Sequence, residues 1–271
     1  MRVPGGMLVK RFLFVAAASL LALGACKTLD SIPKSVPLGL VTVTTGDAPG
    51  FHMTSPTAYF VDAVNVNIPN SSNNADTCAQ IPYPGTQNIS PLAQVNAGTP
   101  VTIATSLDTA QLTPSAADVN GYVFYRLPTN DSIRVLPGSQ SRVIIPGASN
   151  GFHAFNFTFV NADSLALGAI ESSPDSTHDL PLSWHPQVGA LASVVVELEF
   201  GNSPTTVNTQ IFCQFTDNGS HSVQASLANL WRAANTKKVH AYRFLTTFNN
   251  DGTDEVGVVS TYATDNTVIH P

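Results

Sequence analysis

Charged residues are scarce in this sequence: Asp, Glu, Lys and Arg together make up only 11% of its 271 residues. Hydrophobic residues make up 43%. A disordered chain needs the opposite balance, because low hydrophobicity and high net charge are what keep a chain from collapsing. The composition therefore predicts a folded protein, long enough for one large β domain or two smaller domains.

Basic residues are particularly few. The chain holds 12 Lys and Arg against 18 Asp and Glu, a formal charge of −6. Three of the basic residues and none of the acidic ones lie within the first 25 positions, which leaves 9 basic against 18 acidic residues beyond them. Nucleic acid is not an expected partner, because binding to phosphates needs a basic surface patch.

The apolar run near the N-terminus is too short to cross a bilayer comfortably, which takes about 20 apolar residues. It covers residues 12–23 (FLFVAAASLLAL) and follows Lys10 and Arg11. A positive segment, a short apolar run and small residues at its end are the layout of an export signal peptide, here residues 1–25. Met7 is an alternative start that would leave the mature chain unchanged.

The four residues that close this run, Leu23-Gly24-Ala25-Cys26, resemble the lipobox of bacterial lipoproteins. The resemblance covers only the N-terminus. It implies that a diacylglyceryl group is attached to the Cys26 thiol, that cleavage occurs just before Cys26, and that the new amine often receives a further acyl chain such as palmitate. The alternative is an ordinary signal peptide, with Cys26 an incidental residue.

Lipid on Cys26 would make the bilayer itself a partner, because each buried methylene contributes about 0.8 kcal/mol and two or three chains hold more firmly than one. We then expect a protein of the bacterial cell envelope that faces the periplasm or the exterior. Lys27 resembles the residue that follows the lipid site in enterobacterial lipoproteins sorted to the outer membrane.

Only two cysteines remain beyond Cys26, namely Cys78 and Cys213. Two thiols in an oxidising compartment predict one disulfide, which would stabilise the fold by up to roughly 5 kcal/mol in the chain-entropy model. The alternative is two unrelated buried cysteines. Neither has a cysteine or histidine at the short spacing of zinc sites, so we assign no metal to them.

The mature chain carries a β pattern. Residues 26–37 contain two prolines and no apolar periodicity, which indicates a flexible tether. Short alternating or β-branched runs then recur between turn-forming residues. They are Leu38–Thr44, Ala58–Ile68, Pro100–Thr105, Gly121–Leu127, Ser132–Leu136, Arg142–Ile145, Ala192–Phe200, Thr206–Phe215, Val239–Phe248 and Glu255–Tyr262.

The clearest alternation places Phe155, Phe157 and Phe159 on one face of a strand, which we expect to be buried. No long helical segments separate the runs, so the pattern predicts a mainly β protein with antiparallel sheets in a sandwich, either one large sandwich or two intimately packed ones. One helix is expected near 222–235, with Ser222 as its N-cap and Trp231 as a core anchor.

The segment 172–187 is rich in Pro, Ser and Asp and is either a link between two β halves, 38–171 and 188–271, or a long loop within one domain. It also gathers residues that could serve as metal ligands or acid–base groups: Asp175, His178, Asp179 and His185. No catalytic or metal motif accompanies them, so a solvated loop is the preferred interpretation.

Residues 249–254 (NNDGTD) offer oxygen ligands around a glycine, as calcium loops do, but the glutamate that completes such loops is absent. A hairpin turn at Asp251-Gly252 is the preferred interpretation. The polar residues 71–76 are similarly ambiguous, and Tyr83 is either an exposed aromatic at a loop tip or a packing residue.

No cofactor, metal or catalytic residue is assigned. The sequence favours a membrane-anchored, extracytoplasmic binding or structural module without enzymatic activity, whose ligand would be an extracytoplasmic protein or a carbohydrate. Two other functions stay open: a lipid-anchored hydrolase with its site in 172–187, and a calcium-stabilised module of the adhesin type.

Overall fold

The computed structural model of the chain describes most of it from Val36 onward. The described residues are 36–48, 50–63, 76–83, 93–117, 123–128, 131–189, 191–264 and 269–270. The expected signal peptide, the lipid site Cys26 and most of the tether lie outside these ranges. Described residues of 1–69, 87–161 and 246–261 form one compact unit, unit 1, and those of 70–86, 162–245 and 262–271 form unit 2.

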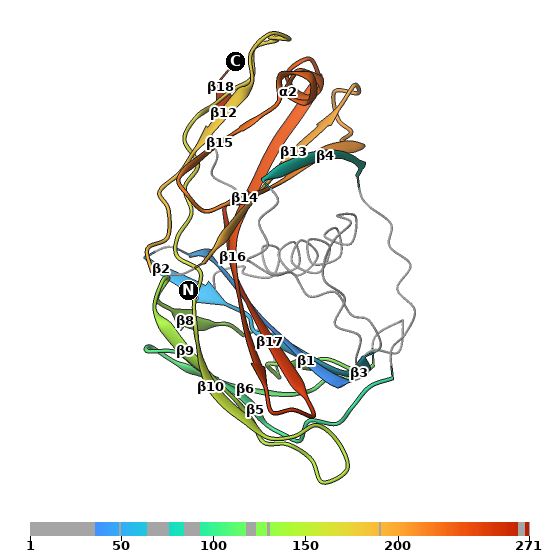
Figure 1. Cartoon of the computed structure of the whole chain (residues 1–271), viewed down its shortest axis with the longest axis vertical. Coiled ribbons are helices and arrows are strands. Elements are labelled where there is room, and N and C mark those ends of the chain that lie inside the picture. Colours follow the sequence, from blue (N-terminus) through green and yellow to red (C-terminus); the bar gives the residue numbers. More distant parts are fainter. Residues whose placement is uncertain are drawn as a thin grey trace, which may run out of the picture. The chain divides into compact units, whose positions relative to one another are not determined.

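Unit 1 is built from short strands in an antiparallel arrangement (Figure 1). Their bounds are β1 (Val36–Ala48), β2 (Phe51–Thr54), β3 (Thr57–Ala63), β5 (Val101–Ala104), β6 (Thr109–Pro114), β7 (Tyr125–Arg126), β8 (Ile133–Val135), β9 (Gln140–Ile145) and β10 (Phe155–Val160). The strand order is β10-β9-β5-β6-β7-β3-β1, and β2 also pairs with β1 and β8.

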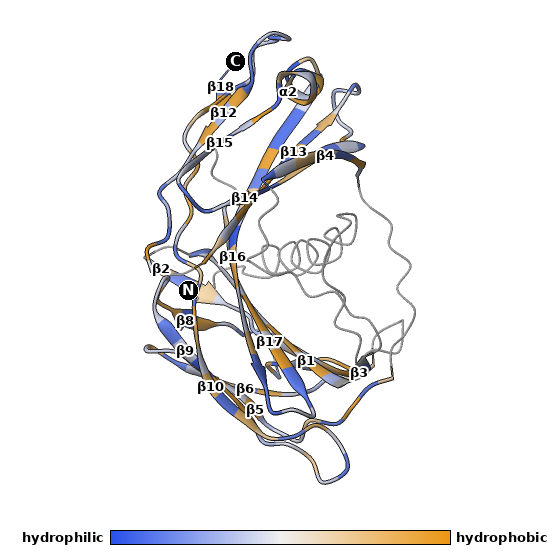
Figure 2. Cartoon of the chain, in the orientation of Figure 1, coloured by the Kyte–Doolittle hydropathy of each residue, from blue (hydrophilic) through white to orange (hydrophobic). Residues whose placement is uncertain are grey.

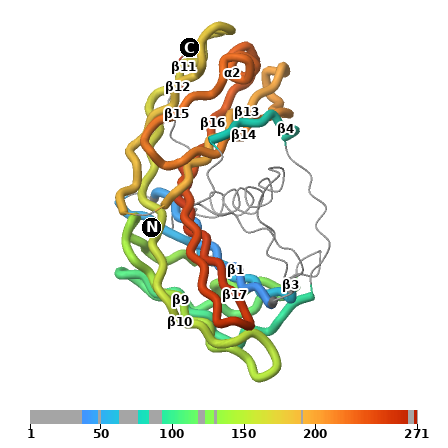
Figure 3. The backbone as a smooth tube through the Cα atoms, viewed as in Figure 1, coloured from blue at the N-terminus to red at the C-terminus, as the bar shows by residue number. Residues whose placement is uncertain are grey.

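Two strands contribute to both units. They are β16 (Thr236–Asn250) and β17 (Glu255–Thr264), which are neighbours in the strand order and lie side by side (Figure 3). Residues 246–250 of β16 and 255–261 of β17 belong to unit 1, and the rest of each strand belongs to unit 2.

The core of unit 1 follows from the alternation of its strands, along which hydrophobic and hydrophilic residues are interleaved (Figure 2). Val41 and Val43 of β1 are fully buried in the same cluster as Val143 and Ile145 of β9. As expected, the Phe155, Phe157 and Phe159 side chains of β10 face this cluster, while Asn156 and Thr158 are exposed. Residues from two groups of strands thus fill one core, as in a sandwich.

Unit 2 combines a sheet with smaller elements. Its remaining strands and helix are β4 (Thr77–Pro82), β11 (Ile170–Glu171), β12 (Leu180–Ser183), β13 (Ser193–Gly201), β14 (Thr209–Thr216), β15 (Ser220–Val223), α2 (Ala225–Arg232) and β18 (Ile269–His270). The sheet order is β16-β13-β14-β4; β12 pairs antiparallel with β15, and β11 pairs parallel with β18.

The expected fold class is therefore confirmed: the chain is mainly β, mostly antiparallel, with one helix in its described part. Each of the runs named from the sequence overlaps a strand. The segment 172–187 lies within unit 2 and contains β12, while the division between the units comes after Asn161. No helix among the described residues is long and apolar enough to span a membrane.

Helix α2 is found where it was expected, but it begins later. Ser222 pairs with Pro181 inside β15, so the prediction that it caps the helix was wrong, and Gln224 is the N-cap residue without a side-chain cap. The Asp179 carboxylate accepts a hydrogen bond from the Ala225 backbone N–H at 2.8 Å and supplies the missing acceptor. Trp231 is fully buried, which confirms its expected role in the core.

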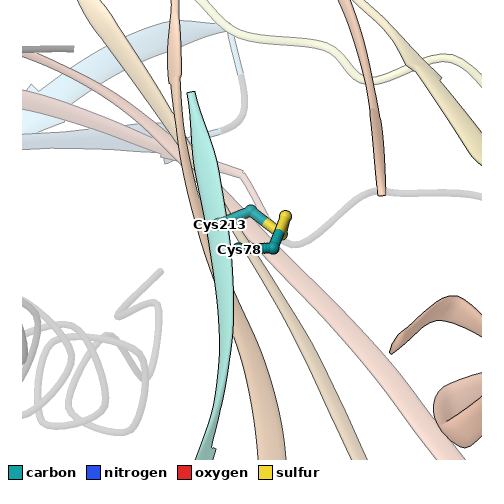
Figure 4. Close-up of a disulfide and its surroundings, with 2 residues drawn as sticks. All are labelled: Cys78 and Cys213. Atoms are coloured by element: carbon teal, nitrogen blue, oxygen red, sulfur yellow. A yellow bond between two sulfur atoms is a disulfide. The ribbon is translucent and has the colours of Figure 1, made fainter. Parts of the chain in front are cut away.

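The expected disulfide between Cys78 and Cys213 is present, with an S–S distance of 2.05 Å (Figure 4). The two residues lie directly opposite each other on β4 and β14. Because β4 comes from 70–86 and is the last strand in the order of the unit 2 sheet, the bridge fastens an early part of the chain to a sheet otherwise formed by residues beyond 192.

Candidate functional site

A group of buried ionisable side chains lies on one face of the unit 2 sheet. Glu197 and Glu199 are two residues apart on β13, so both project from the same face. Their exposed fractions are 7% and 2%. Two carboxylates in the middle of an apolar strand are costly to bury and therefore mark a place where function rather than stability can explain the sequence.

The strands on either side add polar and aromatic groups to the same face. Glu197 is directly opposite His240 of β16 and Phe212 of β14, and Glu199 is opposite Lys238 of β16 and Gln210 of β14. Residues opposite each other in antiparallel strands share a face. We call Glu197, Glu199, Gln210, Phe212 and His240 the acidic face.

His240 and Tyr83 border the two carboxylates. The Nε2 atom of His240 lies 3.6 Å from Oε1 of Glu199, and the His240 side chain remains 28% exposed. Tyr83, just beyond β4, is held by a hydrogen bond from its backbone N–H to the Asn208 carbonyl at 3.0 Å and is 36% exposed. Within the described residues, Oε2 of Glu199 is buried and accepts no hydrogen bond.

Burial controls the electrostatics of the acidic face. Desolvation raises the pKa of Glu197 to about 7, an effect that the nearby His240 opposes and the charge of Glu199 reinforces. Burial, the negative charge of Glu199, a side-chain hydrogen bond to Glu199 and the charge of Glu197 also raise the pKa of Tyr83. At neutral pH, Glu197 is thus present in both its protonated and its ionised form, and it can donate as well as accept a hydrogen bond.

The acidic face is chemically suited to binding a polar, uncharged or cationic molecule. The groups that reach the surface are the His240 imidazole, which offers hydrogen bonds, and the Tyr83 ring, because Glu197, Glu199, Gln210 and Phe212 are all buried. Among the described residues, no three His, Cys, Asp or Glu side chains are placed to hold a metal ion together.

The sequence offered 172–187 as a site, and the structure brings only two of its four candidate residues together. Nδ1 of His178 lies 2.8 Å from Oδ2 of Asp175, and the His178 side chain is 79% exposed. The Asp175 carboxylate also accepts hydrogen bonds from the backbone N–H groups of Thr177 and His178, which keeps its pKa far below the usual range. This is the hydrogen bonding of a turn.

The other two candidates have structural contacts elsewhere. The Asp179 carboxylate caps α2, and the His185 backbone carbonyl accepts a hydrogen bond from the Arg243 guanidinium. The buried Arg232 guanidinium donates to the carbonyls of Asp175 and His178 at 3.0 and 2.8 Å, which fastens this segment to the helix. The geometry therefore favours the solvated-loop interpretation.

Residues 249–254 form the hairpin turn between β16 and β17, as preferred from the sequence. Gly252 has a φ of +92°, a conformation that suits glycine. Oδ1 of Asp251 accepts the backbone N–H groups of Thr253 and Asp254 at 2.8 Å each. The oxygens that a calcium ion would need are thus occupied by the turn itself.

Of the ambiguous segment 71–76, only Asp76 is described. Its Oδ1 accepts a hydrogen bond from the Thr216 backbone N–H at 2.6 Å and lies 3.2 Å from Nε2 of His221. The ring of His221 in turn stacks on Phe215, with centroids 4.6 Å apart. Asp76 therefore acts as a structural contact between the start of β4 and the end of β14.

The acidic face was missed in the sequence, although a signal for it exists. The run VVVELEF places two glutamates at alternate positions inside an otherwise apolar strand. A half-exposed strand would alternate polar and apolar residues throughout, and a strand buried on both faces would be apolar throughout. His240 gave no signal, and Tyr83 was noted only as a possible exposed aromatic, because only the pairing of β13 with β16 and the placement of β4 bring the two residues near the glutamates.

Comparison with known proteins gives no relative from which a role could be inferred. No family model matches the chain, and no curated protein matches it. Among solved structures, the chain is similar to the yeast delta-COP-I mu-homology domain at 7% identity, over 90% of this chain and 100% of that one, with a TM-score of 0.24. A TM-score this low carries no argument about fold or function.

Proposed function

We propose that the chain is a lipid-anchored extracytoplasmic binding protein, held at a membrane of the bacterial cell envelope through Cys26. The observation that supports an extracytoplasmic location is the disulfide between Cys78 and Cys213, because disulfides persist in oxidising compartments and are rare in the cytosol. The lipobox resemblance of residues 23–26 supports the anchor.

The anchor is tested by following lipid on the sulfur of Cys26. Cells expressing the full chain are fed an alkyne-bearing fatty acid, and the protein is isolated and analysed by intact mass. We expect label, a product that begins at Cys26, and recovery in the membrane fraction. A Cys26→Ala variant should lose the label and the membrane association, whereas a Cys78→Ser variant should keep the label. An unlabelled wild-type product cut elsewhere would refute the anchor.

We propose that the ligand is a carbohydrate bound at the acidic face. Support comes from the two partly exposed groups of this region: the His240 imidazole forms directional hydrogen bonds with hydroxyl groups, and the Tyr83 ring provides a surface for the apolar face of a sugar.

Ligand binding is tested with a panel of immobilised glycans and then by calorimetry with any glycan that binds. Glu199→Gln should weaken binding at least tenfold, because it removes the buried charge while preserving shape. Glu255→Gln is the control: it makes the same substitution at a glutamate of unit 1 and should leave binding unchanged. Equal binding by the Glu199→Gln variant and the wild type would rule out the acidic face as the site.

A further inference from the structure

The free edge of β10 in unit 1 is shaped to pair with another strand. Among the residues that the structure describes, β10 is the terminal strand of the order and pairs only with β9. It is six residues long, so the edge extends about 20 Å. An uncovered edge presents a row of backbone N–H and C=O groups, which is a template for pairing.

The hydrogen-bond pattern identifies the groups that point outward. The Asn161 backbone N–H donates to the Ser139 carbonyl at 2.8 Å, which makes that pair a hydrogen-bonded one. Hydrogen-bonded and non-hydrogen-bonded pairs alternate in an antiparallel ladder, so Phe155, Phe157 and Phe159 bond to β9. The N–H and C=O groups of Asn156, Thr158 and Val160 therefore point away from β9.

This edge carries none of the usual protection against pairing. Residues 155–160 (FNFTFV) include no charge, no proline and no glycine. At the opposite end of the strand order, β4 ends in Pro82 and is fastened by the disulfide. The Arg142 Nε atom donates to Oδ1 of Asn156 at 2.5 Å, which turns the Asn156 side chain toward β9 and leaves the edge clear.

We propose that the β10 edge binds the β10 edge of a second copy of this chain, antiparallel, with a two-fold axis at Thr158. The sequence Phe157-Thr158-Phe159 reads the same in both directions, so the axis places Phe157 of one copy beside Phe159 of the other on the core face. Thr158 then faces its own counterpart, and Asn156 faces Val160, in the pairs that exchange backbone hydrogen bonds.

Charge favours a second copy at this place over other parts of the surface. The chain carries a net charge of −6, so two copies repel each other in general, whereas β10 contributes no charge to the contact. Phe157 is only partly buried, unlike Phe155 and Phe159, and pairing would cover it. A single strand per copy is a small interface, so we expect weak dimerisation in dilute solution.

Cross-linking tests both the contact and its register. The mature chain with Thr158→Cys should form a disulfide-linked dimer under mild oxidation, because residues on the axis face each other. Asn156→Cys should cross-link far less, since its counterpart is Val160. Gln111→Cys, an exposed position on β6 between two other strands, is the control for random collision. Dimer yields for Thr158→Cys no higher than for Gln111→Cys would overturn the proposal.

A proline variant separates edge pairing from folding. The Thr158 N–H is not part of the ladder with β9, so Thr158→Pro should keep the fold while removing a hydrogen bond of the dimer. Sedimentation of the wild type should show a mass that rises with concentration, and the Thr158→Pro variant should stay monomeric over the same range. A wild type that stays monomeric at millimolar concentration, or a folded variant that dimerises equally well, would also overturn the proposal.

Discussion

Arg243 and Asp217 form an ion pair in the interior of unit 2, with 2.7 Å between Nε of the arginine and Oδ2 of the aspartate and side-chain exposures of 1% and 2%. The Trp184 indole N–H donates to the same carboxylate at 2.7 Å, and the Gln187 backbone N–H donates at 2.9 Å. The guanidinium also donates to the Ser164 carbonyl at 2.6 Å. One buried pair thus connects β16 to three loop segments of unit 2.

Removing one partner of this pair should be strongly destabilising. Asp217→Asn leaves the Arg243 charge buried without a counter-ion, and we expect a loss of about 3–5 kcal/mol in the free energy of unfolding. Urea denaturation, followed by Trp fluorescence, measures it. Asp108→Asn, which removes an exposed partner of Arg134, is the control and should cost far less, because exposed ion pairs contribute little. Similar losses for the two variants would contradict the assigned role.

Reduction of the disulfide should loosen unit 2. The bridge closes a span of 135 residues, so its loss should lower the free energy of unfolding by up to about 5 kcal/mol in the chain-entropy model. The measurement is urea denaturation with and without reductant, with the Cys78→Ser/Cys213→Ser double variant as the control, which should be insensitive to reductant. An unchanged midpoint of the wild type under verified reduction would argue against this contribution.

Loss of the proton from buried Glu197 should make stability fall as pH rises. Its pKa is about 7 in the folded protein against 4.5 for an ordinary glutamate, so the native state binds more protons than the unfolded state between these values. Stability should therefore decrease from about pH 4.5 to about pH 7, by an amount on the order of 3 kcal/mol, and then level off.

The Glu197→Gln variant tests that assignment. It should match the wild type near pH 4 and exceed it in stability near pH 8, because the neutral amide has no ionisation to oppose. Denaturation midpoints at several pH values provide the comparison. A variant with the same pH profile as the wild type would show that another group titrates.

The His153 and Asp251 pair should strengthen unit 1 at mildly acidic pH. Nδ1 of His153 lies 2.8 Å from Oδ2 of Asp251, and this hydrogen bond, with the charge of Asp254, raises the pKa of His153. The contribution of protonated His153 to the free energy of unfolding is complete below the ordinary histidine pKa of 6.5, and it is lost as pH rises through the raised pKa. Asp251, whose pKa is lowered to about 2, loses its contribution only as pH falls from about 3.8 toward 2.

NMR titration of the histidine rings measures this pair directly. In the Asp251→Asn variant, the pKa of His153 should fall toward 6.5. Asp175→Asn, which alters a carboxylate of unit 2 that contacts His178, should leave the pKa of His153 raised and serves as the control. A His153 pKa that does not move would mean that the carboxylate does not act on it.

The strands could be predicted because their signal is local. Phe155, Phe157 and Phe159 alternate with polar residues, and that period of two alone specifies which face is buried. The turn at Gly252 was equally local. Ser222 was misplaced as a cap because its capping propensity was considered without β12, which pairs with it and was not foreseen in a segment rich in Pro and Asp.

The candidate site could not be predicted, because it depends on pairing between distant segments. Glu199 and His240 are adjacent only through the register of β13 and β16, and Tyr83 joins them only because β4 belongs to unit 2. The cysteines were the exception: the chemistry of the pair, rather than any periodicity, identified two distant positions as neighbours.

The placement of β4 has a consequence for how the polypeptide can be divided. Residues 77–82 are translated between two stretches that belong to the other unit, and β16 and β17 cross from one unit to the other and back. No single cut therefore releases either unit as an uninterrupted piece. Truncation at any one point should leave an incomplete sheet. In limited proteolysis and in expression of the chain as two fragments, the two units should therefore fold or unfold together.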